Sequence, residues 1–180
     1  MNAAGEAVVQ RPLAGSTPAS GVTFEAFARL ERRPLVAFAW SLTGDLGVAE
    51  DLAQDALEAA WQAWDRVGGY DKPGAWARRV VANRAAGHRR RRGRERRALG
   101  RLAGRRGATI ELEASDDRFW RELRNLPERQ AQAVALHYLE DLPIAQIAVV
   151  LECAEGTVKV HLHRGRLALA RALGLDPGAG

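Results

Sequence analysis

The stretch IAQIAVVLECAEGTVKVHLHRGR, residues 144–166, decides the fold of the C-terminal part of this chain. Apolar residues recur in residues 144–151 at the three-and-four spacing of one buried helix face. A turn of about four residues, 152–155 (ECAE), follows. A second buried stripe follows, made of Val158, Leu162, Gly165 and Leu169. The stretch therefore predicts a short helix, a tight turn and a second helix, which is the helix-turn-helix arrangement.

The outward face of the second helix is rich in hydrogen-bond donors. It carries Lys159, His161, His163, Arg164 and Arg166. Such side chains can meet phosphates or base edges, and the free N–H groups where the helix starts, at 155–157, favour a phosphate. His161 and His163 are two residues apart and point in different directions, so they make a poor metal pair. We therefore predict a DNA-binding helix, with an ordinary solvated basic helix as the alternative.

Two more helices are predicted immediately upstream of this stretch. Residues 119–126 give a short helix with Phe119, Leu123 and Leu126 on one face. Pro127 suits the first turn of the next helix, because that position needs no N–H donor. The predicted inward residues of this next helix are Ala131, Val134 and Tyr138. Residues 141–143, Asp-Leu-Pro, then stop it and start the helix of the opening stretch.

The N-terminal half also has helical periodicity. Thr23 is a good N-cap for a first helix, and Pro34 is expected to break that helix or to begin a new one. Residues 43–45, Thr-Gly-Asp, are a turn signal. Residues 48–67 form the clearest helix, because one buried apolar stripe faces a side of carboxylate and amide residues.

A loop and an arginine-rich helix follow. Glycine and proline predict a loop over 68–74, and a helix from about Ala75 runs into the arginines. We expect Trp76, Val80 and Val81 to face inward, and Arg78, Arg79, Asn83 and Arg84 to face outward. Glycines then interrupt residues 93–115, which is typical of a linker. The predicted organisation is a tail (1–22), a helical domain (23–92), a flexible basic linker (93–115), a second helical domain (116–174) and a short tail (175–180).

Charge is distributed unevenly along the 180 residues. The formal net charge is +5, and 25 of the 27 basic residues are arginine. Between Arg78 and Arg106 there are 13 arginines and a single acid, Glu95, so this block carries +12 and the remainder −7. Such segregation favours a polyanionic partner. A solvated arginine-rich surface is the alternative that composition leaves open.

Composition excludes several other classes of protein. The single cysteine, Cys153, rules out an intramolecular disulfide framework and a Cys-based zinc site, and it is expected to pack in the turn. No apolar run approaches the ~18 residues of a membrane helix, and no secretory signal is visible at the N-terminus. We therefore expect a cytoplasmic protein without membrane insertion.

Two groups of short motifs resemble one protein family. Residues 126–130 (LPERQ), 139–143 (LEDLP), 146–151 (QIAVVL) and 155–166 (EGTVKVHLHRGR) closely resemble region 4 of bacterial RNA polymerase sigma factors of the extracytoplasmic-function (ECF) group. Residues 42–45 (LTGD), 49–57 (AEDLAQDAL), 60–61 (AW), Trp76 and 81–84 (VANR) resemble region 2 of the same group. The resemblance covers about residues 24–174, in the family's order, and leaves no room for a region 3 domain.

The resemblance implies contacts with core RNA polymerase. In the family, a region 2 helix docks on a coiled coil of the β′ subunit, and the β subunit is a further partner. The matching positions here are Asp51, Gln54, Asp55 and Glu58. Carboxylates on one helix face can pair with arginines of a partner helix. The alternatives are a solvated face, or a Mg²⁺ site of a nucleic-acid enzyme built on Asp51, Asp55 and Glu58.

The resemblance also implies that region 2 reads the −10 promoter element as single-stranded DNA. An asparagine can pair with a base edge, a tyrosine can stack on a base, and arginines can hold phosphates. Val67 is smaller than the apolar or aromatic residue expected there. The positions implied are Arg66, Val67, Tyr70, Lys72, Arg78, Arg79, Asn83, Arg84, Arg89 and Arg90.

For the −35 element, the resemblance implies reading by the last helix in the major groove. Val160 replaces a common serine and offers an apolar contact, for example to a thymine methyl. Glu155 can accept from cytosine N4 or cap the helix start. The positions implied are Glu155, Thr157, Lys159, Val160, His161, His163, Arg164 and Arg166.

Together these inferences predict an all-α protein of two small helical domains, a region 2 bundle and a region 4 helix-turn-helix. The expected function is that of an alternative sigma factor, with core RNA polymerase, promoter DNA and an anti-sigma factor as partners. We expect no catalytic residues, no metal and no cofactor. The alternatives are a stand-alone helix-turn-helix regulator, which would bind duplex DNA without polymerase, and a metal-dependent nucleic-acid enzyme.

Overall fold

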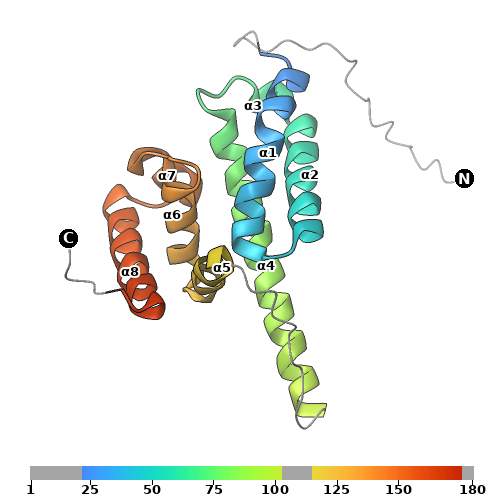
Figure 1. The fold of residues 1–180 in the computed structure, drawn as a ribbon. Helices are drawn as coiled ribbons and strands as arrows, with labels where there is room; N and C mark the ends of the chain where they lie inside the picture. Colours follow the sequence, from blue (N-terminus) through green and yellow to red (C-terminus); the bar gives the residue numbers. More distant parts are fainter. Residues whose placement is uncertain (1–21, 103–114, 176–180) are drawn as a thin grey trace, which may run out of the picture.

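The computed structural model describes residues 22–102 and 115–175, and within these ranges the chain is helical and has no strand (Figure 1). Residues 1–21, 103–114 and 176–180 lie outside the described residues, so the predicted tails and most of the predicted linker are not described. The helices are α1 (Phe24–Thr43), α2 (Leu46–Gln62), α3 (Trp64–Val67), α4 (Pro73–Leu102), α5 (Ser115–Asn125), α6 (Glu128–Tyr138), α7 (Ile144–Leu151) and α8 (Glu155–Leu173).

The N-terminal domain is a bundle of α1, α2 and the first half of α4. Thr23 caps α1 as predicted, since its hydroxyl accepts from the N–H of Ala26 at 3.3 Å. The predicted turn is confirmed, because Gly44 ends α1 with φ 71° and Asp45 caps α2 through the N–H of Val48. Phe38 and other apolar side chains of the three helices form the core.

The sequence predicted that Pro34 breaks the first helix or begins a new one, but Pro34 does not break α1. The helix passes through it without interruption. An internal proline removes one backbone hydrogen bond and costs roughly 3 kcal/mol. Leu35, Phe38 and Leu42 are all buried on the following turns, and their burial offsets that cost.

The helix predicted over 48–67 is two helices. Ala63 leaves helical geometry with φ −109° and ψ 16°, so α2 ends at Gln62 and α3 begins at Trp64. The buried stripe nevertheless continues across the break, because Trp64 and Val67 are both in the core. Trp64 packs there against Phe24 and Phe27.

Helix α4 begins before Ala75 and extends beyond the predicted domain boundary at residue 92. It runs from Pro73 to Leu102 and protrudes from the bundle (Figure 1). Arginine is a good helix former, and each internal glycine costs about 1 kcal/mol, which is too little to stop the helix at Gly93. The arginine block is therefore helical over its described part, up to Leu102.

The C-terminal domain consists of α5–α8, and α7 and α8 form the predicted helix-turn-helix. Val158, Leu162, Gly165 and Leu169 are buried as expected. Tyr138, which was expected to face inward, is 56% exposed at the end of α6. Its ring packs on His137 instead of entering the core.

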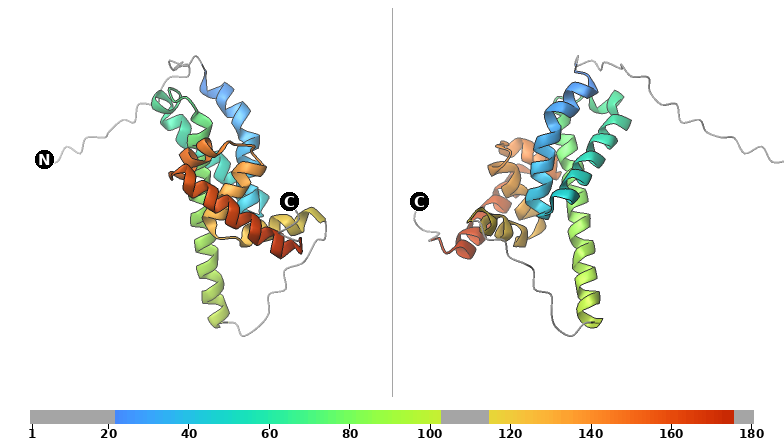
Figure 2. Two further views of the ribbon diagram at one scale, coloured as in Figure 1. Left: turned by 90° about the vertical axis from the view of Figure 1, so that its left-hand side faces the viewer. Right: turned by 45° about the vertical axis from the view of Figure 1, so that its right-hand side comes forward.

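The two domains pack against each other (Figure 2). Helix α7 contacts α4, and α1 contacts α5 and α6. Trp40 of α1 meets Trp120 of α5 edge-to-face, with ring centroids 5.4 Å apart. Helix α8 contacts α5, α6 and α7 and lies on the side of its domain away from α1 and α2 (Figures 1 and 2).

Candidate nucleic-acid interfaces

The outward face of α8 is open to solvent. Gly165 lets the helix approach α6 closely, because a Cβ at this position would lie 2.7 Å from Cγ2 of Val134. This seating presents the opposite face of α8 outward. The exposed predicted residues on it are Glu155, Thr157, Lys159, Val160, His163, Arg164 and Arg166. The arrangement suits insertion of α8 into a DNA major groove.

His161 differs from its neighbours on α8, because its side chain is half-buried. Burial is the main cause that lowers the pKa of His161, and the positive charges of Arg129 and Arg164 lower it further. The imidazole is therefore neutral at neutral pH. It can donate or accept a hydrogen bond there but brings no positive charge to a phosphate.

The turn between α7 and α8 is three residues long, 152–154. Glu152 ends α7 in the left-handed region with φ 52°, an unusual conformation for a residue other than glycine. Its carboxylate binds Arg79 of α4 at 2.7 Å. Cys153 is half-buried in the turn, as expected from the sequence.

The predicted −10 residues divide into exposed and engaged groups. Exposed side chains are Arg66 of α3, Tyr70 and Lys72 of the loop before α4, and Asn83 of α4. Val67, which was expected to border a base pocket, is 0% exposed and belongs to the core. Its side chain therefore offers no surface to DNA.

Five predicted arginines of α4 are engaged within the chain. Arg78 was expected to face outward but is buried, and it pairs with Glu31 at 2.7 Å and Glu140 at 2.5 Å. The others bind groups of both domains: Arg79 binds Glu152, Arg84 binds Asp55, Arg90 binds Glu128, and Arg89 donates to the carbonyls of Arg124 and Leu126. Burial lowers the pKa of Arg89, and the charge of Glu128 acts in the opposite direction.

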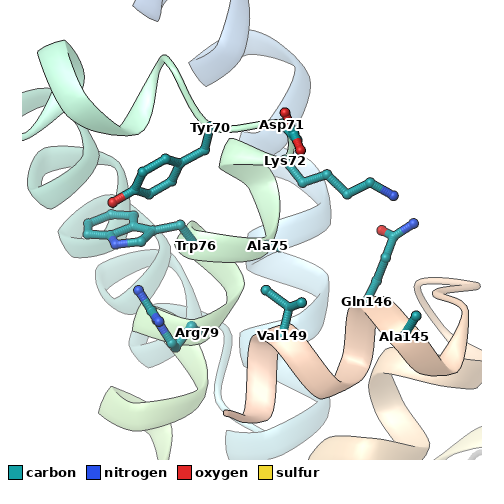
Figure 3. Close-up of a pocket in the computed structure, with 9 residues that line it drawn as sticks. All are labelled: Tyr70, Asp71, Lys72, Ala75, Trp76, Arg79, Ala145, Gln146 and Val149. Atoms are coloured by element: carbon teal, nitrogen blue, oxygen red, sulfur yellow. The ribbon is translucent and has the colours of Figure 1, made fainter. Parts of the chain in front are cut away.

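A cavity of about 520 Å³ lies where the predicted −10 loop meets α7 (Figure 3). Tyr70, Lys72, Trp76 and Arg79 line it from the N-terminal domain. Figure 3 shows side chains of α7 rising toward them, from the lining residues Ala145, Gln146 and Val149. Aromatic faces beside Lys72 are suited to a nucleotide, while Arg79 is held by Glu152 and the carboxylate of Asp71 also lines the cavity. Trp76 was predicted to face inward; it is partly buried against the core and also lines this cavity.

The acidic face of α2 is exposed and borders an apolar groove. Asp51, Gln54 and Glu58 are exposed, and Gln54 donates to Glu58 at 3.0 Å. Asp55 is half-buried and engaged by Arg84. The groove has a volume of about 440 Å³ and its lining residues are Phe24, Glu25, Ala28, Gln54, Leu57, Glu58 and Trp61.

The groove lies next to the acidic face of α2. Protein–protein interfaces combine an apolar centre with a polar rim, so the groove and the acidic face together suit a protein partner. Sequence reasoning missed its apolar part, although an aromatic residue on each of two helices was a visible signal.

No cluster of metal-ligating side chains is present in residues 22–102 and 115–175. No helix within those ranges has the length and apolar character needed to span a membrane.

Comparison with known proteins gives matches over both domains. The family model Sigma-70 region 2 matches residues 18–95, and the model Sigma-70, region 4 matches residues 116–169. The ECF RNA polymerase sigma factor SigL of Mycobacterium tuberculosis is 33% identical over 143 residues, which are 76% of this chain and 80% of that protein. SigW of Bacillus subtilis, also an ECF sigma factor, is 26% identical over 74% of this chain and 80% of its own length.

A solved structure is also similar to this chain. It is the sigma factor RpoE from Bartonella quintana in complex with the anti-sigma factor NepR. The TM-score is 0.67 at 29% identity, and the match covers 85% of this chain and 98% of RpoE.

Proposed function

This chain belongs to the ECF group of the sigma-70 family, and we propose that its two domains divide promoter recognition between the surfaces described above. It is an alternative sigma factor, which binds core RNA polymerase and directs promoter recognition. The relatives it matches are sigma factors. We infer that it acts in the cytoplasm, where bacterial polymerase and DNA are found, and that it has no catalytic role of its own.

The −35 element is assigned to α8. The observation that carries this assignment is the exposed face of α8 within the region that matches Sigma-70, region 4. Arg164 and Lys159 are the donors for base edges or phosphates, and Val160 supplies an apolar contact. Arg166 and Thr157 bind phosphates, while His161 is neutral and contributes a hydrogen bond at most.

The −10 strand is assigned to the loop before α4 and to the first half of α4. We assign Asn83 and Tyr70 to unstacked bases, and Lys72 and Arg66 to phosphates, and the exposure of all four side chains supports this assignment. Trapped bases and phosphate contacts must supply the few kcal/mol needed to unpair each base. Five arginines of α4 bind phosphates of the −10 strand once their partners within the chain have released them: Arg78, Arg79, Arg84, Arg89 and Arg90.

Core polymerase is assigned to α2 and the groove beside it. Asp51 and Glu58 provide charge complementarity to a basic helix of the β′ coiled coil, and the groove near Trp61 accepts an apolar side chain. We also infer an anti-sigma factor as a partner, because RpoE, a relative of similar fold, was solved with one.

Run-off transcription tests this function directly. The purified chain is added to bacterial core polymerase on a library of genomic fragments, and transcripts are mapped. We expect promoter-specific transcripts that require the chain and share a −10 and a −35 sequence. A stand-alone regulator would instead bind duplex DNA tightly without polymerase and give no such transcripts.

A further inference from the structure

Residues 91–102, the last part of α4, form a basic arm that protrudes from the bundle. In Figures 1 and 2 this arm stands apart from the other helices. Ala86 is the last buried residue of α4 among the side chains that the structure describes. The match to Sigma-70 region 2 ends at residue 95, but the helix continues to Leu102. At a rise of 1.5 Å per residue, the arm extends α4 by about 18 Å.

The arm carries a high positive charge. It contains six arginines and one acid, Glu95, which gives a net charge of +5. Three of its arginines have exposed side chains: Arg91, Arg92 and Arg94. Among the residues that the structure describes, none of these three has an ion pair. Glu128 lies at the base of the arm, but its carboxylate is already paired with Arg90 at 3.0 Å.

The charges of the arm oppose its helical conformation. Arg94 follows Arg90 by four residues and Arg91 by three, so these side chains are neighbours on the helix surface and their charges repel each other. The described side chains of the arm include no buried apolar stripe whose packing could offset this repulsion. A polyanion that neutralises the arginines would stabilise the helix. The arm therefore favours a negatively charged partner.

The exposed arginines of the arm surround the helix instead of lining one face. Successive residues of an α-helix are about 100° apart, so Arg92 and Arg94 project from nearly opposite sides, with Arg91 between them. The major groove of duplex DNA is about 12 Å wide, which admits an α-helix, and a phosphate strand runs along each of its edges. A helix lying in this groove can therefore place Arg92 and Arg94 against opposite strands.

A single strand suits the arm less well than a duplex does, because the arm has no stacking surface. Proteins that bind single-stranded nucleic acid place its bases on aromatic side chains. No phenylalanine, tyrosine or tryptophan occurs between Trp76 and Phe119. The arm also has no asparagine or glutamine to pair with a base edge. Its arginines therefore suit the phosphates of a duplex better than the bases of a strand.

The place of the arm in the chain indicates which duplex it meets. The −10 strand is assigned to side chains within residues 66–90 and the −35 element to residues 155–166, and the arm lies between these segments in the sequence. Arg94 is eleven residues beyond Asn83 on the same helix, a distance of about 16 Å along its axis. The two promoter elements flank the spacer, which is the duplex DNA between them. A helix that leads from the −10 reader toward the −35 reader therefore meets the spacer.

We propose that the basic arm binds the spacer duplex in its major groove, with Arg91, Arg92 and Arg94 holding phosphates. This contact is additional to the two promoter contacts of the proposed function, and the inference rests on that function for the identity of the DNA. Phosphate contacts position a protein without reading sequence. The arm therefore adds an affinity that depends steeply on salt and is the same for spacers of any sequence.

The first test compares the full-length wild type with the triple variant Arg91→Gln, Arg92→Gln and Arg94→Gln. Glutamine removes the charge but is nearly as good a helix former as arginine, so the arm keeps its conformation. Fluorescence anisotropy measures binding to a labelled duplex that contains neither promoter element, over a series of KCl concentrations. We expect the slope of log affinity against log salt to become shallower by about 2–3, since each phosphate contact contributes roughly 0.9. An unchanged slope would overturn the proposal.

The matched control is the triple variant Arg29→Gln, Arg32→Gln and Arg33→Gln. These three arginines are also exposed on a helix, but they lie on α1. The control therefore removes the same charge from the same number of arginines. We expect its salt slope to stay close to that of the wild type. Slopes that become equally shallow in both variants would mean that total charge, and not the arm, sets the salt dependence, and would refute the proposal.

The same titrations with single-stranded DNA and with RNA of equal length distinguish the duplex from other polyanions. At about 0.1 M KCl, we expect the arm variant to lose roughly ten-fold or more in affinity for the duplex and much less for either single strand. An equal or larger loss for a single strand would contradict the assignment to duplex DNA.

A tethered cleavage reagent locates the arm on a promoter. Ala98 is exposed on the arm and Cys153 is the single cysteine, so Ala98→Cys combined with Cys153→Ser gives one attachment point for an iron chelate. In the complex with core polymerase, we expect cleavage of the spacer between the mapped elements. Cleavage confined to the −10 strand, or no cleavage of DNA, would overturn the proposal. The duplex titrations need no polymerase, so failure of run-off transcription would reject the proposed function and leave the result for the arm distinct.

Discussion

Gly165 is the residue at which packing of the helix-turn-helix is most sensitive. An alanine there would place a Cβ 2.7 Å from Val134, which is buried and cannot move away. We predict that Gly165→Ala lowers the free energy of unfolding by roughly 1–3 kcal/mol, the usual cost of overpacking. Gly87→Ala is the control, because a Cβ at Gly87 meets nothing within 4 Å and alanine favours the helix by about 1 kcal/mol. Thermal unfolding that changes in the same direction for both variants would contradict this account.

His161 makes stability depend on pH in a defined direction. Burial, with help from Arg129 and Arg164, lowers its pKa in the folded protein, so the unfolded chain binds the proton more tightly. The contribution of neutral His161 to the free energy of unfolding is therefore complete above about pH 6.5, the pKa in the unfolded chain. It is lost as the pH falls through the lowered pKa of the folded protein. We predict that urea unfolding between about pH 7.5 and pH 5 shows a larger loss of stability in the wild type than in His161→Gln. Equal losses would show that His161 does not contribute.

The −35 assignment concerns helix α8 as a whole. The buried stripe of α8 fixes how the helix is seated, and this orients all of its outward side chains together. We predict that Arg164→Ala relaxes the −35 preference at one base position by about 1–3 kcal/mol. Arg171→Ala, an exposed change in the last turn of the same helix, should leave the preference profile unchanged. Promoter libraries transcribed by the two variants measure this. A profile that is the same for Arg164→Ala and the wild type would reassign Arg164 to phosphate or solvent.

Helix α4 combines two properties, an arginine-rich surface and an exposed asparagine near its buried stripe. We predict that Asn83→Ala weakens open-complex formation more than it weakens binding to core polymerase, because polymerase is assigned to α2. Permanganate footprinting of the melted region and a polymerase binding assay measure the two quantities. Equal loss of both would contradict a base contact by Asn83.

For the whole molecule, long-range ion pairs should contribute to stability according to their burial. Arg78→Ala leaves two largely buried carboxylates without their partner, and we predict a loss of about 3–5 kcal/mol. Arg84→Ala removes a pair in which both side chains are over 40% exposed, and we predict a loss of about 0.2–1 kcal/mol. Chemical denaturation measures both. A loss for Arg84→Ala as large as that for Arg78→Ala would contradict this ranking.

The sequence determined most of the helical elements of this protein and the exposed faces of α2 and α8. Local signals, such as the Thr23 cap, the Gly44 turn and the stripe ending at Leu169, depend on neighbours a few residues away, and the structure confirms them. Two of its errors also concern local signals. Pro34 and Gly93 were taken as helix breakers, but costs of about 1–3 kcal/mol per residue were overcome by buried packing along α1 and by good helix formers along α4.

Only the tertiary structure decided what the arginines of α4 do in the free chain. Arg78 was predicted to be exposed, since every arginine in a basic run looks alike from its local pattern. Its partners, Glu31 and Glu140, lie 47 and 62 residues away and carry no signal that links them to it. An arginine is buried when carboxylates from distant segments satisfy its charge, and that depends on how the domains pack. Periodicity therefore predicted which side chains form each helix face, while packing decided which of these faces is covered.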